Sequence, residues 1–157
     1  DVEFSFNTDS AATKAQLASG DLSLRLAAEG CVDSLVAHFL DFSDSLNYQL
    51  ANKSLNQSTL KSTLPVMSFF INAGRHNPLS NILRHKDYTY NGIYINLNTH
   101  PENGLNGQAH VGNLKSGSLL LDTVHLNIRQ EAEGLVMNGT IHNYTRRNPN
   151  KLRYIYL

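Results

Sequence analysis

Apolar and polar side chains alternate along the first thirty residues of the chain. Two segments, DVEFSFNT at the start and GDLSLRLAAEG further on, follow this period of two. Their apolar positions are Val2, Phe4, Phe6, Leu22, Leu24 and Leu26. A period of two is expected of a β-strand with one apolar face, so both segments are predicted strands. The small and polar stretch between them predicts a hairpin connection with a short strand around residues 15–18.

The period becomes helical after Gly30. The apolar side chains between residues 32 and 50 fall within an arc of roughly 160° when successive residues are turned by about 100°. They are Val32, Leu35, Val36, Phe39, Leu40, Phe42, Leu46 and Leu50. This pattern predicts an amphipathic helix, followed by a second short helix through Leu60 and Leu64 that ends at Pro65. We therefore expect a helical insertion over about residues 31–64.

The stretch after Pro65 returns to a strand composition. In VMSFFINAG the residues of both faces are apolar, which predicts a strand buried on both sides. Asn77 is a favourable N-cap and Pro78 suits the first position of a helix. The segment HNPLSNILRHKD is therefore a predicted short helix.

From Tyr88 to the end, the chain shows only strand and turn patterns. Alternating segments succeed each other about every 12 residues, and they are separated by PENG, KSGS, AEG and RRNPN. This rhythm is typical of an antiparallel meander, here over about residues 88–157. In SLLLDTVHLNI the apolar positions change phase at Asp122, which a β-bulge or a corner of the sheet would explain.

These patterns predict a mainly β fold with a helical insertion, in the α+β class. We expect an antiparallel meander sheet, curved or trough-like, with the amphipathic helix packed on its apolar face. The 157 residues fit a single domain or one slice of a longer, repeat-built protein. Because the chain opens on Asp1 and stops inside the alternating run KLRYIYL, we expect it to be a piece of a longer protein.

Charge and cysteine content exclude several classes of function. Thirteen basic residues balance thirteen acidic ones, so no long-range field draws the chain toward nucleic acid, and we expect no such partner. Cys31 is the single cysteine, which excludes an internal disulfide and a thiolate metal cluster. No apolar run reaches the roughly 18 residues that span a bilayer, and no signal pattern begins the chain. We expect any membrane anchor to lie outside this sequence.

Seven histidines raise the question of a metal site. They are His38, His76, His85, His100, His110, His125 and His142. No two of them have the i, i+2 or i, i+4 spacing that presents two imidazoles on one face. His100 and His110 lie in the two arms of one predicted hairpin, but both are out of phase with the apolar positions, as are His125 and His142. We interpret these four as residues of the polar strand face.

No pattern for catalysis or cofactor binding accompanies these histidines. The sequence has no serine flanked by glycines as in a nucleophile elbow, no phosphate-binding glycine loop and no closely spaced carboxylates for acid–base work. We therefore expect no catalytic, cofactor-binding or metal-binding residues.

The apolar face of a meander sheet is either covered by another part of the protein or available to a ligand or partner. Each leucine or isoleucine left exposed forfeits roughly 1.5 to 3 kcal/mol, and one helix covers only a few strands. The rest of the face can stay open as an apolar trough. The side chains that would line such a trough, or form a core under the helix, are Phe4, Phe6, Leu22, Leu24, Leu26, Ile93, Ile95, Leu97, Leu126 and Ile128.

The chain resembles the AsmA/TamB-like cell-envelope proteins, specifically the large TamB-like members of Bacteroidetes-type bacteria. The resemblance covers nearly the whole chain and is carried by GDLSLRLAAEG, LNQSTLKSTLP, FFINAGRHNPLSNIL, YNGIYINLNTHPENGLNGQAHV and GSLLLDTVHLNIRQEAEGLVMNGTIHN. It implies a segment of a long periplasmic protein, held at the inner membrane by a helix outside this sequence. In such proteins repeated β-units form an elongated trough.

The resemblance also implies a role in outer-membrane biogenesis, without enzyme activity. The module would contribute to phospholipid transport between the inner and outer membranes, or to outer-membrane protein assembly with a barrel partner. The alternative is a structural or docking module, whose sheet edges pair with neighbouring repeats or with a barrel protein. The helical insertion departs from a plain trough repeat, so both alternatives stay open.

Overall fold

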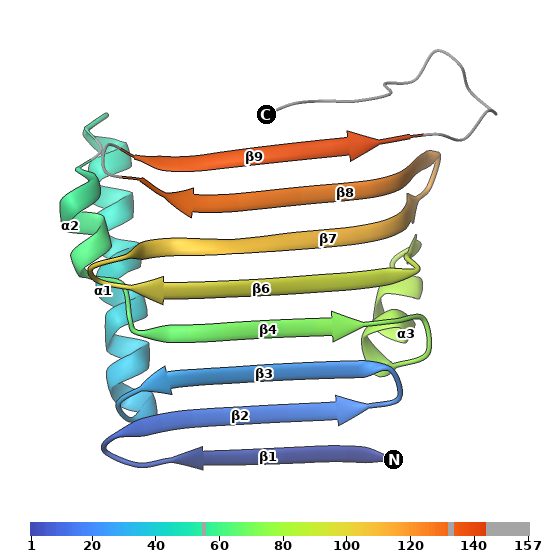
Figure 1. Ribbon diagram of the computed structural model, residues 1–157, viewed down its shortest axis with the longest axis horizontal. Helices are drawn as coiled ribbons and strands as arrows, with labels where there is room; N and C mark the ends of the chain where they lie inside the picture. The colour runs from blue at the N-terminus through green and yellow to red at the C-terminus, as the bar shows by residue number, and fades with distance from the viewer. Residues whose placement is uncertain (55, 132–133, 144–157) are drawn as a thin grey trace.

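The protein forms an open antiparallel sheet in the computed structural model, which describes residues 1–54, 56–131 and 134–143. Eight of the described strands lie side by side in the order β1-β2-β3-β4-β6-β7-β8-β9, and the short β5 pairs with β7 (Figure 1). Their bounds are β1 Val2–Thr8, β2 Ala12–Ser19, β3 Leu22–Glu29, β4 Met67–Ala73, β5 Tyr88–Thr89, β6 Gly92–His100, β7 Gly104–Ser116, β8 Leu119–Gln130 and β9 Leu135–His142. The mainly β meander that the sequence predicts is confirmed as far as residue 143; residues 144–157 of the predicted meander lie outside the described residues.

Two helical segments interrupt the meander. The helices α1 Val32–Ala51 and α2 Gln57–Ser62 lie between β3 and β4, and α3 Pro78–Arg84 lies between β4 and β5. Figure 1 shows α1 running across one end of the strands with α2 beside it, and α3 at the opposite end. All three helices are predicted by the sequence, although α2 ends before Leu64 rather than including it.

The strand β2 is longer than the sequence predicts. It covers eight residues, whereas the pattern indicates only a short strand around residues 15–18. Four of these residues are alanine or serine, whose small side chains give a weak period-two signal. Pairing with both neighbours defines the strand instead, because all of its residues pair with β3 and all but the first pair with β1.

A network of hydrogen bonds attaches α3 to the turn between β2 and β3. The Asn77 side chain accepts from the Ser80 backbone N–H at 2.9 Å, and the Asn77 N–H donates to the Ser80 hydroxyl, which together form a capping box. The Asp21 carboxylate accepts from the His76 backbone N–H and from the Asn77 amide. At Gly20, φ is +60°, and a Cβ atom would lie 2.2 Å from the His76 carbonyl oxygen. Only glycine therefore allows the turn and α3 to approach so closely.

The β7–β8 hairpin turns a corner near its tip. Gly112 lies opposite Thr123 and Leu114 opposite Leu121, so the register is the same on both sides of the phase change and no residue is inserted. Between these pairs Asn113 takes a left-handed conformation with φ of 48°. Of the two explanations that the sequence allows for the change of phase, the structure has the corner and not the β-bulge.

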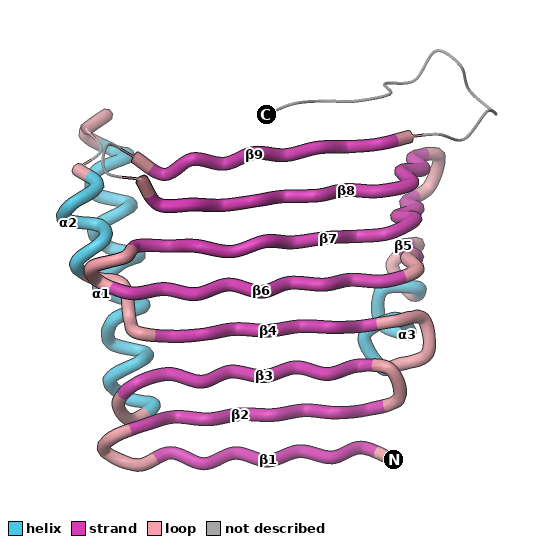
Figure 2. The backbone as a smooth tube through the Cα atoms, viewed as in Figure 1, coloured by secondary structure: helices cyan, strands magenta, loops and turns pink. Residues whose placement is uncertain are grey.

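Few apolar side chains are buried in this single-layer sheet. Within the described part of the chain, the buried apolar residues are Leu22, Ala28, Leu35, Leu64, Ala73 and Tyr90. The burial on both sides predicted for β4 is wrong, because Phe69 on one face and Phe70 on the other both keep partial exposure. The helices cover the ends of the strands, and no described element lies over their middle on either face (Figure 2).

Candidate functional site

The strand register sorts side chains onto two faces of opposite character. On one face, two rows cross the eight long strands and contain only apolar residues and glycine. The first row is Phe4, Leu17, Leu24, Ile71, Ile95, Ala109, Leu126 and Gly139, and the second is Phe6, Ala15, Leu26, Phe69, Leu97, Gly107, Ile128 and Met137. We call these two rows the open apolar face.

Towards one end of the strands, the row of side chains next to the open apolar face is covered by α3. Leu79 and Leu83 of this helix pack against a buried cluster of Leu22, Ala73 and Tyr90. The hydrogen bonds around the helix N-terminus hold it there. This end of the sheet is therefore the small hydrophobic core of the molecule.

Towards the other end of the strands, α1 and α2 cover side chains of the row next to the open apolar face, which includes Leu105 and Leu135. These helices enclose an apolar hollow of about 280 Å³ against the ends of β7 and β9. Its apolar lining is Phe42, Leu46, Leu60, Leu64, Leu105 and Leu135. Leu105 lies two residues from Gly107, and Leu22 lies two residues from Leu24, so both helical segments stand on the same side of the sheet as the open apolar face. They form rims at its two ends.

No side chain of the open apolar face is buried. The exposed fraction is 68% for Phe4 and 50% for Phe6 on β1, and 52% for Met137 on β9. Gly139 is buried, and the other residues of the two rows are half-buried, because neighbours on adjacent strands flank them. Contiguous apolar surfaces often mark interaction sites on proteins, so the open apolar face is the candidate functional surface.

Most of the predicted trough-lining residues lie on the open apolar face. Those that do are Phe4, Phe6, Leu24, Leu26, Ile95, Leu97, Leu126 and Ile128. The other two, Leu22 and Ile93, lie under α3, where Leu22 is only 6% exposed. These two residues therefore belong to a core under α3, whereas the sequence predicts a core under the helix over residues 32–51.

Sequence reasoning did not include several residues of this face. Phe69 and Ile71 have the period-two spacing of one shared face, but the apolar residues on both sides of β4 predict burial rather than an open surface. Leu17 lies in a segment of small and polar residues, where the period-two pattern is weak. Met137 lies on the last described strand and has the same phase as Leu135.

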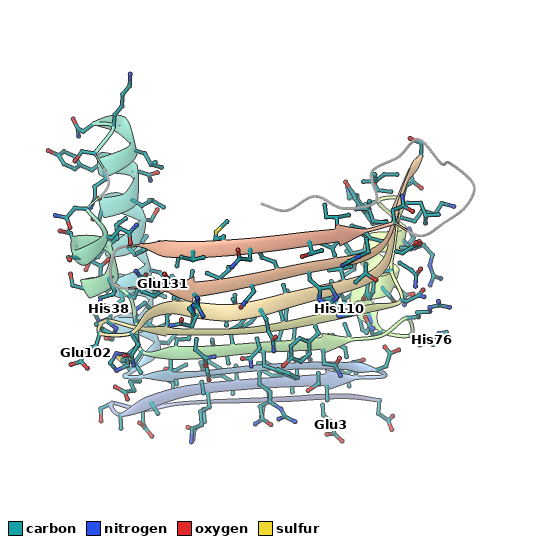
Figure 3. All side chains as sticks on the ribbon, turned by 45° about the horizontal axis from the view of Figure 1, so that its top comes forward. Glu3, His38, His76, Glu102, His110 and Glu131 are labelled. Carbon is teal, nitrogen blue, oxygen red and sulfur yellow. The ribbon has the colours of Figure 1, made fainter. Side chains whose placement is uncertain are left out.

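The histidines of the strands lie on the opposite, polar face, but the hairpin does not bring its two histidines together. His100 lies opposite Gly104, and His110 lies opposite Tyr94. His110 instead meets His125 across the next strand pair, with ring centroids 4.3 Å apart. Figure 3 labels His110, and it shows Glu3, another residue of the polar face, pointing away from the side on which α1 rises.

The imidazoles of the polar face do not form a metal centre. Burial lowers the pKa of His125, and the neighbouring imidazoles of His110 and His142 lower it further. The rings of His125 and His142 are 6.5 Å apart. Among the described residues, no three histidine, cysteine, aspartate or glutamate side chains are grouped so that they could hold a metal ion. The cluster offers hydrogen-bonding groups on an open surface rather than a ligand cage.

Two carboxyl groups of the described residues, Asp9 and Asp21, have a lowered pKa and a structural role. Hydrogen bonds from the backbone N–H groups of Ala12 and Ala11 lower the pKa of Asp9 in the β1–β2 turn. The hydrogen bond from the Asn77 amide, supported by the His76 backbone N–H, lowers the pKa of Asp21. Each carboxylate is occupied by the turn or helix that it caps.

None of the described helices is both long enough and apolar enough to cross a membrane. No family model, curated protein or solved structure matches the chain.

Proposed function

We propose that this chain is a non-enzymatic module of a cell-envelope protein and that its open apolar face carries the acyl chains of phospholipids. One observation carries the proposal: two adjacent rows of the sheet contain no polar side chain, and no described element covers them between the two helical rims. Acyl chains gain free energy by leaving water and need no directional contact. A continuous apolar floor is therefore sufficient to bind them.

The open apolar face has the dimensions of lipid tails. Its eight strands, spaced about 4.8 Å apart, extend over roughly 34 Å. The hydrocarbon core of a bilayer is about 30 Å thick, so the tails of one leaflet span about half of that. Two tails laid end to end would fit across the strands. The two rows lie about 7 Å apart along the strands, which leaves a narrow path rather than a broad plate.

Gly107 has no side chain, which leaves room on this face for the neighbouring Leu97 side chain. A Cβ atom at Gly107 would lie 2.4 Å from the Asn96 carbonyl oxygen and 2.6 Å from the Leu97 side chain. The Leu97 side chain therefore leans over the Gly107 backbone, and a larger residue at this position would displace it. Gly139 occupies the same face two strands further along.

The rim helix α1 adds apolar surface beside the path. Leu35 at one margin of its apolar arc is buried, whereas other residues of the same arc remain exposed. Their exposed fractions are 51% for Val36, 44% for Phe39, 60% for Leu40 and 55% for Leu50. In this mechanism the tails exchange passively along apolar side chains while the headgroup stays in water. No nucleophile, metal or cofactor takes part.

The envelope setting of the proposal comes from the resemblance of the chain to AsmA/TamB-like proteins. We propose that the module belongs to a periplasmic protein anchored at the inner membrane through a segment outside this sequence. Its task there would be phospholipid transport between the inner and outer membranes, or support of outer-membrane protein assembly. The uncovered apolar face supports the transport role, because a lipid path requires such a surface.

Docking through the sheet edges is a second candidate function. Among the described strands, β1 pairs only with β2, and β9 pairs only with β8. Within the described residues, the outer edges of β1 and β9 are therefore unpaired, and another strand can add to such an edge. Val2 on β1 is 67% exposed, so a neighbouring repeat or a barrel protein would also gain apolar contacts there.

Site-specific photo-crosslinking tests the lipid path. A benzophenone amino acid replaces Leu24 on the open apolar face, and a matched variant carries it at Arg25, the next residue on the same strand but on the polar face. Both proteins are incubated with vesicles of phosphatidylethanolamine and phosphatidylglycerol, irradiated and analysed by mass spectrometry. We expect a phospholipid adduct at position 24 and none at position 25.

A second pair repeats the comparison on another strand. The crosslinker replaces Leu126 in one protein and Asn127 in its control. Adducts at both apolar positions support a continuous path. Equal labelling of the two faces, or no adduct at Leu24 and Leu126, would refute it. Capture of a purified barrel protein through a crosslinker at Val2 in that case would favour docking.

A further inference from the structure

The polar face carries a straight row of carboxamide side chains. Asn96, Gln108, Asn127 and Asn138 lie directly opposite one another on β6, β7, β8 and β9. Adjacent members are one strand spacing apart, which is about 4.8 Å. We call these four residues the carboxamide row.

The carboxamide row has no structural partner that explains it. Asparagine is disfavoured in strands, because its short amide competes for local backbone hydrogen bonds. Asn96 accepts a long hydrogen bond of 3.5 Å from the Asn98 amide. Within the described part of the chain, the side chains of Gln108, Asn127 and Asn138 make no hydrogen bond to protein, and all three are exposed. Their donors and acceptors are therefore available to a ligand.

An aromatic pair adjoins one end of the carboxamide row. Phe70 lies opposite Asn96, and its ring packs edge-on against Tyr94 with centroids 5.6 Å apart. The Arg25 guanidinium lies 5.8 Å from the centre of the Phe70 ring. Phe70 is the one phenylalanine of the described strands on this face, and it is half-buried there. Such a ring provides an apolar platform beside hydrogen-bonding groups.

A shallow hollow lies beside the same row. It has a volume of about 540 Å³, and residues of the polar face in its lining include Lys14, Ala27, Ser68, Asn98 and Asn106. Asn98 is two residues from Asn96 on β6, so the hollow continues the surface of the carboxamide row toward the strand ends. Concave surfaces of this size, with a few polar groups, are typical of small-ligand sites.

The low charge around the carboxamide row indicates which class of ligand it fits. The row itself is neutral. Arg129 beside it is paired with Glu131, and Arg25 at the Phe70 ring and Lys14 in the hollow are single cations on separate strands that form no continuous track. A nucleic acid would require a track of lysine and arginine along its phosphates. A carboxamide offers both a donor and an acceptor, which matches the hydroxyl groups of a sugar, and the C–H face of a sugar ring packs on an aromatic platform. We infer that the carboxamide row, with Phe70, binds a neutral oligosaccharide that lies across the strands.

Affinity electrophoresis tests this inference without knowledge of the natural glycan. The protein is run through native gels that contain laminarin, galactomannan, hydroxyethyl cellulose or dextran, with bovine albumin as a reference. We expect retardation in at least one of these gels. The double variant Gln108→Thr, Asn127→Thr keeps strand propensity and removes the central carboxamides, and we expect its affinity to fall at least tenfold. Phe70→Leu should weaken binding separately.

Matched controls make the result decisive. Asn7→Thr replaces an exposed asparagine of the same face on β1, outside the carboxamide row, and should leave binding unchanged. Circular dichroism checks that each variant is folded. The inference would be overturned if none of the four gels retards the protein and no neutral oligosaccharide on an array binds it. An equal loss of affinity with Asn7→Thr would also overturn it, as would retardation only in gels that contain a polyanion such as RNA. The inference does not rest on the lipid path, because the two surfaces lie on opposite faces.

Discussion

Two leucines on one strand test whether the middle of the apolar face is open in solution. Leu22 and Leu24 lie two residues apart on β3 and point to the same face. Leu22 is 6% exposed and packs beneath α3, whereas Leu24 is half-buried and lies in the uncovered first row. The substitutions Leu22→Ala and Leu24→Ala remove the same atoms. Any difference between them therefore comes from what covers each site.

The expected magnitudes follow from these surroundings. Leu22→Ala loses the transfer free energy of a buried side chain and leaves a cavity under Leu79 and Leu83, so we expect a loss of about 3 kcal/mol. Leu24→Ala loses only part of the transfer term, and water fills the space that is created. We expect about 1.5 kcal/mol there. Ser23→Ala on the polar face of the same strand should change the stability by less than about 0.5 kcal/mol.

Urea denaturation followed by circular dichroism measures these differences. With an m-value of about 2 kcal/mol/M, the midpoint should fall by about 1.5 M for Leu22→Ala and by about 0.75 M for Leu24→Ala. The measurement is repeated over a range of protein concentrations. Equal losses at the two sites would mean that the centre of the face is covered in solution. If the midpoints also rose with concentration, a second copy of the chain would be the cover, and the open-path argument would fail.

Three further predictions concern the hydrogen-bonded turn and the polar face. Asn77→Ala removes the capping box and leaves the Asp21 carboxylate without its amide donor, so urea denaturation should show a loss of about 2 kcal/mol; an unchanged midpoint would show that α3 is held by packing alone. Because the folded-state pKa of Asp21 is lowered from 3.8, the stability that it contributes is present above that value and lost as the pH falls through the lowered pKa. Asp21→Asn should remove this part of the acid dependence, and an identical acid profile in both proteins would contradict the assignment. The pKa of His125 is lowered from 6.5, so protonation is less favourable in the folded state and the stability falls as the pH decreases from 6.5 through the lowered pKa. His110→Gln should raise that pKa in an NMR titration, whereas the distant His76→Gln should not.

The elements that the sequence predicts well are those whose signal is local. The helix over residues 32–51 follows from one continuous apolar arc, and α3 follows from Asn77 and Pro78 side by side. The strands with large alternating side chains, such as β1 and β6, are equally clear. In contrast, β2 contains mainly small residues, and only pairing with its neighbours shows its full length.

The arrangement of the sites depends on register, which a single strand does not contain. The sequence places one histidine in each arm of the β6–β7 hairpin, but the turn sets His100 opposite Gly104. The two-residue turn at Gly117 and Ser118 sets His110 opposite His125 instead. The position of the helices at the strand ends is also a tertiary property. The open apolar face could therefore be predicted in composition but not in extent.

The two faces of the sheet depend on each other, because successive residues of each strand point to opposite faces. A slip of one residue in any pair would move a carboxamide onto the apolar face and an aliphatic side chain onto the polar face. Ligands on either face would favour the same register, and any ligand that binds only the folded sheet stabilises it in proportion to the logarithm of its concentration above Kd. The free energy gained in this way does not depend on the size of the core, but it is a larger share of the total stability when few apolar residues are buried. A lipid on one face and a glycan on the other should therefore each raise the unfolding midpoint. Because Leu24 lies on the open apolar face and Asn127 in the carboxamide row, substitutions at these residues should abolish the two shifts independently.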